Sequence, residues 1–173
     1  GDGLSGKVFR GAMYLPGKGL RSQNGEIYFG SADGLVVFHP DSLQKNSYVP
    51  PVRITGFSIH NQPVRVTGAS AGTLESGTSL THAISFAKQV KLLHNQNDFT
   101  FEFAALNFIH PEGNDYKYKL EPYETEWVET TAANRVARYT NISPGKYTFR
   151  VIGSNDDGVW NEEGASVIVI ITP

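Results

Sequence analysis

The residues of this chain that could do chemistry are five histidines and one acidic segment. The histidines are His39, His60, His82, His94 and His110. None lies four residues from another, as two ligands on one helix turn would, and none stands in a tight cluster of carboxylates. A zinc site assembled from separate strands is the metal hypothesis that this spacing leaves open. His39, directly before Pro40, is expected to serve the exit from a strand instead.

Four glutamates surround Pro122 and Trp127: Glu121, Glu124, Glu126 and Glu129. Two carboxylates about 5–9 Å apart across a cleft could hydrolyse a glycosidic bond. Carboxylates clustered in one short loop are more typical of a solvated rim. The segment Asn155-Asp156-Asp157-Gly158 lacks the alternating ligands and distal glutamate of a calcium-binding loop, so it predicts a turn between strands. We therefore expect no catalytic residue, no metal and no cofactor.

The composition excludes several other classes of protein. The 173 residues include no cysteine, which removes disulfides, thiolate zinc sites and cysteine nucleophiles. A net charge of −2 with no block of like charge does not favour nucleic acid or an anionic membrane as a partner. No apolar run is long enough to span a bilayer, and no signal segment opens the chain. Any export signal or membrane anchor is expected outside this sequence.

Alternating apolar and polar residues predict β-strands along most of the chain. In residues 99–103 the three phenylalanines fall on one face, because successive side chains of a strand point to opposite sides. Residues 116–120 and 147–151 repeat this pattern with tyrosine, phenylalanine and aliphatic residues. Further strands are predicted at 12–15, 26–30, 35–38, 52–59, 64–66, 91–93 and 167–171, with Val52, Ile54 and Phe57 inward and the last strand covered on both faces. Turns are predicted at 31–34, 61–63 and 94–98, and an exposed loop at 67–78.

Two adjacent prolines, Pro50 and Pro51, divide the chain into two predicted domains. A double proline cannot lie in a central strand, so it predicts a domain boundary and a hinge between residues 1–50 and 51–173. Strands recur about every 8–12 residues in the second domain, which indicates a β-sandwich.

Residues 52–173 resemble the Y_Y_Y domain. The matching motifs are residues 97–106, Tyr116-x-Tyr118-x-Leu120-Glu121, Trp127, residues 138–141, Pro144-Gly145-x-Tyr147-x-Phe149-x-Val151 and residues 155–161. The resemblance implies an all-β fold, an immunoglobulin- or fibronectin-III-like β-sandwich of the kind that follows β-propeller repeats in bacterial sensor proteins.

Residues 1–50 are similar to the last repeat of the two-component regulator propeller. The similarity rests on Asp2-Gly3-Leu4, on residues 25–35 and on Phe38-His39-Pro40. A propeller closes several blades into a ring, and a single partial blade leaves strand edges unpaired. We expect residues 1–50 to pack on the sandwich or to pair with a second copy of the chain.

The resemblance also implies a function. Similar proteins are hybrid two-component sensors, often from gut Bacteroidetes, that detect products of carbohydrate breakdown in the periplasm. A propeller precedes their Y_Y_Y domain, and one membrane helix, a histidine kinase, a receiver and a DNA-binding domain follow it. We therefore expect a non-catalytic periplasmic segment of an inner-membrane-anchored homodimer, which couples ligand sensing by the propeller to the kinase.

A rival hypothesis uses three aromatic residues, Tyr123, Trp127 and Trp160, as exposed platforms that stack on the rings of an oligosaccharide. The chain would then be a carbohydrate-binding module or the accessory sandwich of a glycan-degrading enzyme. The sequence leaves open whether Trp127 and Trp160 are both buried, and an exposed tryptophan would be the first place to look for a partner.

Overall fold

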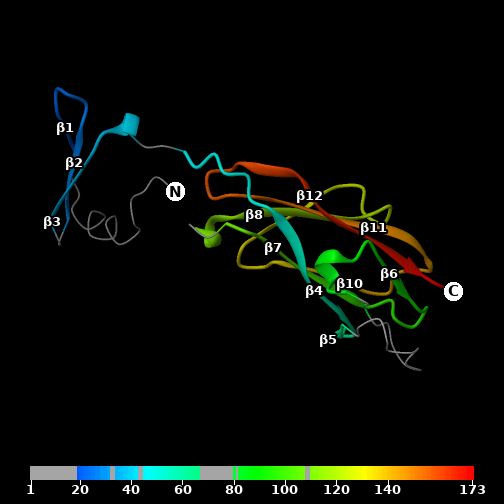
Figure 1. Cartoon of the computed structure of the whole chain (residues 1–173). Helices are drawn as coiled ribbons and strands as arrows, with labels where there is room; N and C mark the ends of the chain where they lie inside the picture. The colour runs from blue at the N-terminus through cyan, green and yellow to red at the C-terminus, as the bar shows by residue number, and fades with distance from the viewer. Residues whose placement is uncertain (1–18, 32–33, 43–44, 67–79, 81, 108–109) are drawn as a thin grey trace. The chain divides into compact units, whose positions relative to one another are not determined.

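A computed structural model describes residues 19–31, 34–42, 45–66, 80, 82–107 and 110–173 (Figure 1). The chain divides into two compact units, Gly1–Ser47 and Tyr48–Pro173. The predicted strand at 12–15, the predicted loop at 67–78 and the Asp2-Gly3-Leu4 motif lie outside the described residues. What is described is all-β, with three single turns of 3-10 helix, η1 (Pro40–Ser42), η2 (Ile84–Phe86) and η3 (Pro111–Gly113).

The first unit is a small antiparallel sheet. Its strands lie in the order β1 (Leu20–Arg21), β2 (Ile27–Ser31) and β3 (Gly34–Phe38). Ser31 pairs with Gly34, so β2 and β3 form the predicted hairpin. A propeller blade has four strands, so the assignment of this three-stranded sheet to a partial blade stays a prediction.

His39 has a structural role at the exit from this sheet, where its imidazole makes two hydrogen bonds to the backbone. Its Nε2–H donates to the carbonyl oxygen of Asn24 at 3.0 Å, and its Nδ1 accepts from the backbone N–H of Asp41 at 3.2 Å. Gly25 lies beneath the ring with φ +92°, and a Cβ there would stand 2.5 Å from Nε2 of His39. The imidazole therefore joins the β1–β2 turn to the exit from β3, as its position before Pro40 predicted.

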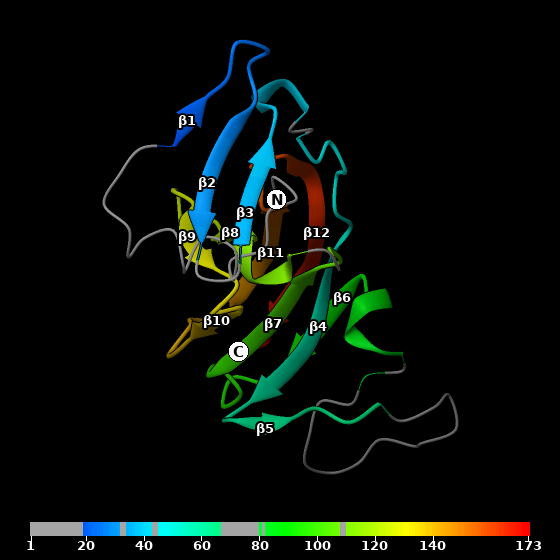
Figure 2. The same ribbon diagram turned by 90° about the vertical axis from the view of Figure 1, so that its left-hand side faces the viewer.

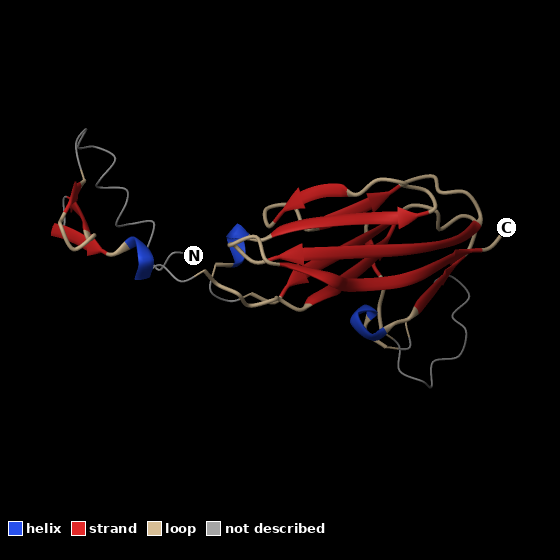
Figure 3. Ribbon diagram, turned by 90° about the horizontal axis from the view of Figure 1, so that it is seen from above, coloured by secondary structure: helices blue, strands red, loops and turns tan. Residues whose placement is uncertain are grey.

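The second unit is a sandwich of two sheets (Figures 2 and 3). One sheet has four strands in the order β10-β7-β4-β5, and the other has five in the order β6-β12-β11-β8-β9. Their bounds are β4 (Val52–Ile59), β5 (Gln62–Pro63), β6 (Gln89–Leu92), β7 (Phe99–Ala105), β8 (Asp115–Glu121), β9 (Val128–Thr131), β10 (Val136–Tyr139), β11 (Gly145–Ser154) and β12 (Trp160–Ile171). All neighbours pair antiparallel except β6 and β12, which are parallel. The sandwich predicted from the alternating pattern is confirmed.

Aromatic rings fill the space between the two sheets. Phe99, Phe101 and Phe103 of β7 are each at most 1% exposed. Phe101 stacks on Phe149 of β11 with 4.4 Å between ring centroids, and Phe103 meets Tyr116 of β8 at 5.4 Å. Each fully buried ring contributes about 1.5–3 kcal/mol of hydrophobic stabilisation, so these contacts between the sheets are a large part of the core.

A β-bulge explains the uneven spacing of the buried residues on β4. Val52 and Ile54 are buried at even positions, and Phe57 and Ile59 at odd positions. The register with β7 shifts between Ile54 and Gly56, and the extra residue returns the later side chains to the core. All three residues predicted to point inward on this strand do so.

The predicted turn at 61–63 and strand at 64–66 are wrong by a few residues. His60 and Asn61 both have positive φ, 48° and 61°, and two such residues suffice for a tight hairpin. Gln62 and Pro63 then already pair with β4 as the short edge strand β5. Proline is tolerated there because an edge strand leaves one side of its backbone unpaired.

The prediction that the last strand is covered on both faces is also wrong. Val167, Val169 and Ile171 are buried, whereas Ile168 and Ile170 between them are only partly buried. Residues 167–171 are all β-branched because such side chains suit a pleated strand, and not because the second face is buried.

Candidate functional site

The outer face of the five-stranded sheet carries both tryptophans. Lys117 and Lys119 of β8 alternate with the buried Tyr116 and Leu120, so their side chains lie on the face away from the core. Lys117 Nζ lies 5.1 Å from the ring centroid of Trp160, at the start of β12. Both tryptophans are therefore partly buried surface residues and not core residues.

Trp127, just before β9, has two cations over its ring. Lys119 Nζ lies 4.9 Å and the guanidinium carbon of Arg150 lies 5.7 Å from the ring centroid. Glu121 binds both cations, at 2.5 Å from Lys119 Nζ and 3.6 Å from Arg150. These two cations and their shared carboxylate hold the indole in a charged cage.

Lys119 and Lys117 lower the pKa of two carboxyl groups on this face, those of Glu121 and Glu129. The hydrogen bond from Lys119 is the main reason that the pKa of Glu121 is lowered, and its charge and that of Arg150 add to the effect. Lys117 Nζ lies 2.8 Å from Glu129 and lowers the pKa of that carboxyl in the same way. Paired carboxyl groups with a lowered pKa are poorly suited to be the proton donor that glycoside hydrolysis requires.

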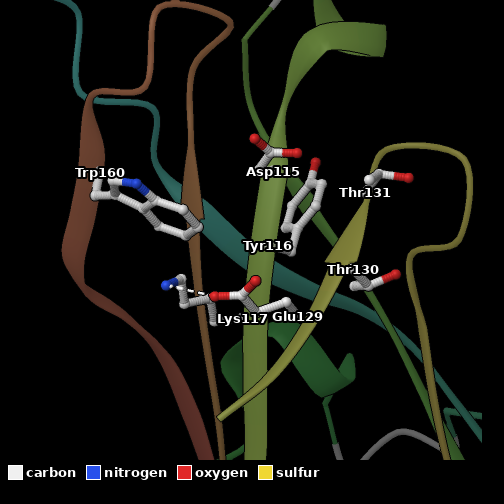
Figure 4. A pocket seen from close by; sticks show the side chains of 7 residues that line it. All are labelled: Asp115, Tyr116, Lys117, Glu129, Thr130, Thr131 and Trp160. Atoms are coloured by element: carbon white, nitrogen blue, oxygen red, sulfur yellow. Dashed lines mark ion pairs between the residues drawn. The ribbon is translucent and has the colours of Figure 1, made fainter.

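A pocket of about 290 Å³ opens beside Trp160 (Figure 4). It is lined by Asp115, Tyr116, Lys117, Glu129, Thr130, Thr131 and Trp160. Strands β12, β8 and β9 supply these residues, with β11 between β12 and β8. The pocket thus combines one indole with carboxylate, ammonium and hydroxyl groups.

The structure separates the three aromatic residues that the sequence nominated as ligand platforms. Trp160 lines the pocket, and Trp127 lies on the same sheet face without lining it. Tyr123 is 59% exposed and packs edge-on against Tyr139 of the other sheet, with 6.3 Å between centroids. Sequence reasoning missed Lys117 as a partner of Trp160; the signal was its outward position between Tyr116 and Tyr118.

Glu124, another of the four glutamates weighed for glycoside hydrolysis, joins parts of the sandwich through hydrogen bonds. Its Oε2 accepts the hydroxyl of the buried Tyr139 at 2.9 Å and the backbone N–H of Leu120 at 2.8 Å. Among the residues that the structure describes, no group of three or more histidines and carboxylates could hold a metal ion. No helix in the described ranges is long and apolar enough to cross a membrane.

Asn155, just after β11, and Asn161, at the start of β12, bind the segment that enters the sandwich. Asn155 Nδ2 donates to the carbonyl oxygen of Tyr48, and Asn161 Nδ2 donates to that of Pro50, both at 2.9 Å. The N–H of Leu106 also donates to the carbonyl of Pro51 at 2.8 Å. We call Asn155, Asn161 and the two carbonyls that they bind the junction clamp.

Tight backbone turns hold both amides of the junction clamp in place. Asn155 Oδ1 accepts the N–H groups of Asp157 and Val159, at 3.0 and 2.9 Å, which confirms the predicted turn. Asn161 Oδ1 accepts the N–H of Gly164 at 3.0 Å. Asn155 thus uses its oxygen to shape the turn after β11 and Asn161 uses its oxygen to hold the irregular start of β12, while both use their nitrogen to bind the junction.

Comparison with known proteins supports the resemblance seen in the sequence. Residues 107–172 match the family model of the Y_Y_Y domain. "Histidine kinase P4" of Formosa agariphila is 36% identical over 160 residues, which cover 92% of this chain and 11% of that protein. This chain therefore spans only a small part of that relative.

Solved extracellular domains from B. thetaiotaomicron share the fold. The extracellular domain of BT3049, described as a hybrid two-component system, is 30% identical with a TM-score of 0.64, over 89% of this chain and 19% of that one. That of BT4673, described as a one-component system, is 24% identical with a TM-score of 0.61, over 89% and 20%. The latter likeness shows the fold alone. Taken with the matched motifs, these findings place residues 107–172 in the Y_Y_Y domain family.

Proposed function

We propose that this chain is part of the periplasmic sensor region of a membrane-anchored hybrid two-component histidine kinase. Its sandwich would transmit, without catalysing a reaction, a change in a preceding propeller that binds a carbohydrate-derived ligand. The relative named as a histidine kinase and the extracellular domain of a hybrid two-component system support the parent class. Membrane anchoring, the propeller, its ligand class and a homodimer are parts of the proposal.

The junction clamp is the observation that carries this proposal. A displacement of Tyr48 or Pro50 acts directly on the connection between β11 and β12, because the two asparagine amides bind their carbonyl oxygens. Strand β12 then runs to Ile171, close to the end of this chain. A packed β-domain moves as a body, so a pull at the junction reaches the far end of β12.

The same contacts bear on the proposed hinge at the double proline. Pro50 is buried, and the carbonyls of Pro50 and Pro51 accept hydrogen bonds from Asn161 and Leu106. Along the chain, the boundary between the two compact units falls between Ser47 and Tyr48, three residues before the predicted boundary. We therefore propose that any relative movement of the two units takes place before Tyr48, and that the prolines move with the sandwich.

Removing the clamp in a full-length sensor tests this function. Asn155→Ala combined with Asn161→Ala should reduce the ligand-induced output of a transcriptional reporter and leave ligand affinity of the purified periplasmic region unchanged. Asn95→Ala, which removes an exposed amide from the β6–β7 turn, is the matched control and should signal normally. Normal signalling by the double variant, with its sandwich folded, would refute transmission through the clamp.

A further inference from the structure

We propose that the pocket at Trp160 binds a neutral sugar ring. The inference rests on the side chains of this pocket and does not depend on signal transmission by the sandwich. Trp160 forms one side, Glu129, Thr130 and Thr131 of β9 form the other, and Asp115 and Lys117 of β8 lie between them (Figure 4).

The lining matches the two kinds of surface that a pyranose presents. A sugar ring has an apolar face of C–H groups and a rim of hydroxyls that both donate and accept hydrogen bonds. The partly buried indole of Trp160 offers a flat apolar surface to the face, next to Lys117 Nζ, which lies 5.1 Å from the centroid of the ring. Asp115 and Glu129 accept hydrogen bonds, Lys117 donates, and the hydroxyl of Thr131 does both, whereas that of Thr130 already donates to the carbonyl oxygen of Asn134 at 2.7 Å.

The charge of the pocket selects against an acidic ligand. Two carboxylates, Asp115 and Glu129, face one ammonium, Lys117, so the titratable side chains lining the pocket sum to one negative charge. The single cation is already paired with Glu129 at 2.8 Å. A uronate or sulfate would meet net repulsion, whereas a hydroxyl can bridge a carboxylate and an ammonium without changing the charge.

Part of the lining is held in position before a ligand arrives. The ion pair fixes Lys117 against Glu129, and the N–H of Asp115 donates to Ser154 Oγ at 3.2 Å. Trp160 follows directly after the turn that Asn155 shapes. Lys117 and Glu129 should then lose little side-chain freedom on binding. A volume of about 290 Å³ lies at the small end for ligand pockets, which suits one ring or the end of a chain.

Trp127 is a comparison site within the same chain. Two cations, Lys119 and Arg150, lie over its ring and both bind Glu121, whereas one cation lies over the ring of Trp160. Trp127 also does not line the pocket. Binding at the pocket should therefore perturb the indole N–H of Trp160 and not that of Trp127.

Two-dimensional ¹H–¹⁵N NMR of the whole chain can test the site. The two indole signals are assigned with Trp127→Phe, and the chain is titrated with methyl β-glucopyranoside, methyl β-galactopyranoside, methyl α-mannopyranoside and glucuronate. We expect at least one neutral glycoside to shift the Trp160 indole and the backbone amides of 115–117 and 129–131, with Trp127 unmoved. No shift with any neutral glycoside, a shift only with glucuronate, or equal shifts at both indoles would each overturn the proposal.

A pair of carboxylate variants separates specific binding from general effects. Asp115→Ala removes an exposed acceptor from the pocket and should weaken the affinity about tenfold, since a hydrogen bond to a charged group is lost. Glu102→Ala removes an exposed carboxylate from the outer face of the other sheet and should leave the affinity unchanged. Equal affinities of the two variants would count against the pocket, while the folded state of each is checked by its own spectrum.

Discussion

The hydroxyl of Tyr116 accepts a hydrogen bond from the backbone N–H of Ala105 at 3.0 Å, and this bond joins the two sheets of the sandwich. Tyr116 belongs to β8 of the five-stranded sheet, and Ala105 ends β7 of the four-stranded sheet. Both residues are buried. The tyrosine is thus a core ring with a polar end that satisfies a buried backbone group of the facing sheet.

Tyr116→Phe should destabilise the sandwich by about 1–3 kcal/mol, because the N–H of Ala105 loses its partner in a buried position. Urea denaturation followed by circular dichroism measures this difference. Tyr147→Phe is the matched control, since the hydroxyl of Tyr147 donates to the carbonyl of Ser143 at the exposed surface. The control should change the stability by less than about 0.5 kcal/mol. Similar losses in the two variants would show that the bond between the sheets has no special weight.

Tyr139 should resist ionisation in the folded protein. Burial and the charge of Glu124 raise its pKa far above the usual value near 10. Its neutral form is favoured by folding, so its contribution to stability is complete below about pH 10 and is lost above it, where the unfolded chain ionises.

An alkaline titration of tyrosine absorbance checks this expectation. In the wild-type chain, Tyr139 should ionise only when the protein unfolds. The fall in the free energy of unfolding between pH 7 and alkaline pH should be smaller in Tyr139→Phe than in the wild type. Tyr123→Phe removes an exposed phenol for comparison. A Tyr139 that titrates near pH 10 without unfolding would contradict the buried bond to Glu124.

Lys119 should keep Glu121 ionised to unusually low pH. Its hydrogen bond is the main cause of the lowered pKa, and such a carboxylate contributes stability above its unfolded pKa that is lost as pH falls through the lower folded value. Lys119→Met should therefore raise the pKa of Glu121, measured by NMR of its side-chain carboxyl carbon. Lys88→Met, at an exposed site just before β6, should not change that pKa. An unchanged pKa of Glu121 in Lys119→Met would exclude the ion pair with Lys119 as the cause of the lowered pKa.

Gly164 is required by both its conformation and its surroundings. Its φ is +61°, and a Cβ there would lie 2.1 Å from the carbonyl oxygen of Val151. Gly164→Ala should cost roughly 3 kcal/mol or more, since strain and a backbone clash add. Gly158→Ala isolates the strain, because its φ is +77° with nothing within 4 Å, and it should cost about 1–2 kcal/mol. Thermal unfolding should give Gly164→Ala the lower midpoint temperature of the two variants. Equal midpoints would mean that the backbone near Val151 shifts enough to remove the clash.

The period-two pattern was enough to predict the strands whose inward faces are aromatic, because alternation alone defines the buried side. It could not locate the bulge after Ile54, which depends on pairing with β7. Nor could the pattern predict the contact between Lys117 and Trp160, because that contact depends on the spatial order β12-β11-β8 and not on neighbours in sequence. The sequence showed Asn155 only in a predicted turn and Asn161 only in a family motif, because their partners lie more than a hundred residues earlier.

The double proline should matter less for signalling than the asparagines that bind its segment. Replacing Pro50 and Pro51 by alanine keeps both backbone carbonyls, so the hydrogen bonds from Asn161 and Leu106 can still form. In a full-length sensor this variant should therefore keep its ligand-induced reporter output, in contrast to the variant that lacks Asn155 and Asn161.

The pair of results separates two mechanisms. A sandwich that receives its input through the clamp loses output only when the amides are removed. A sensor that bends at the prolines loses output when they become alanine, whatever the state of the asparagines.

Proteolysis of the purified periplasmic region at residues 45–51 adds a readout that is independent of signalling. Cleavage should increase in the asparagine variant, because Tyr48 and Pro50 are released from β11–β12, and should stay slow in the proline variant. The reverse order would place the moving element at the prolines.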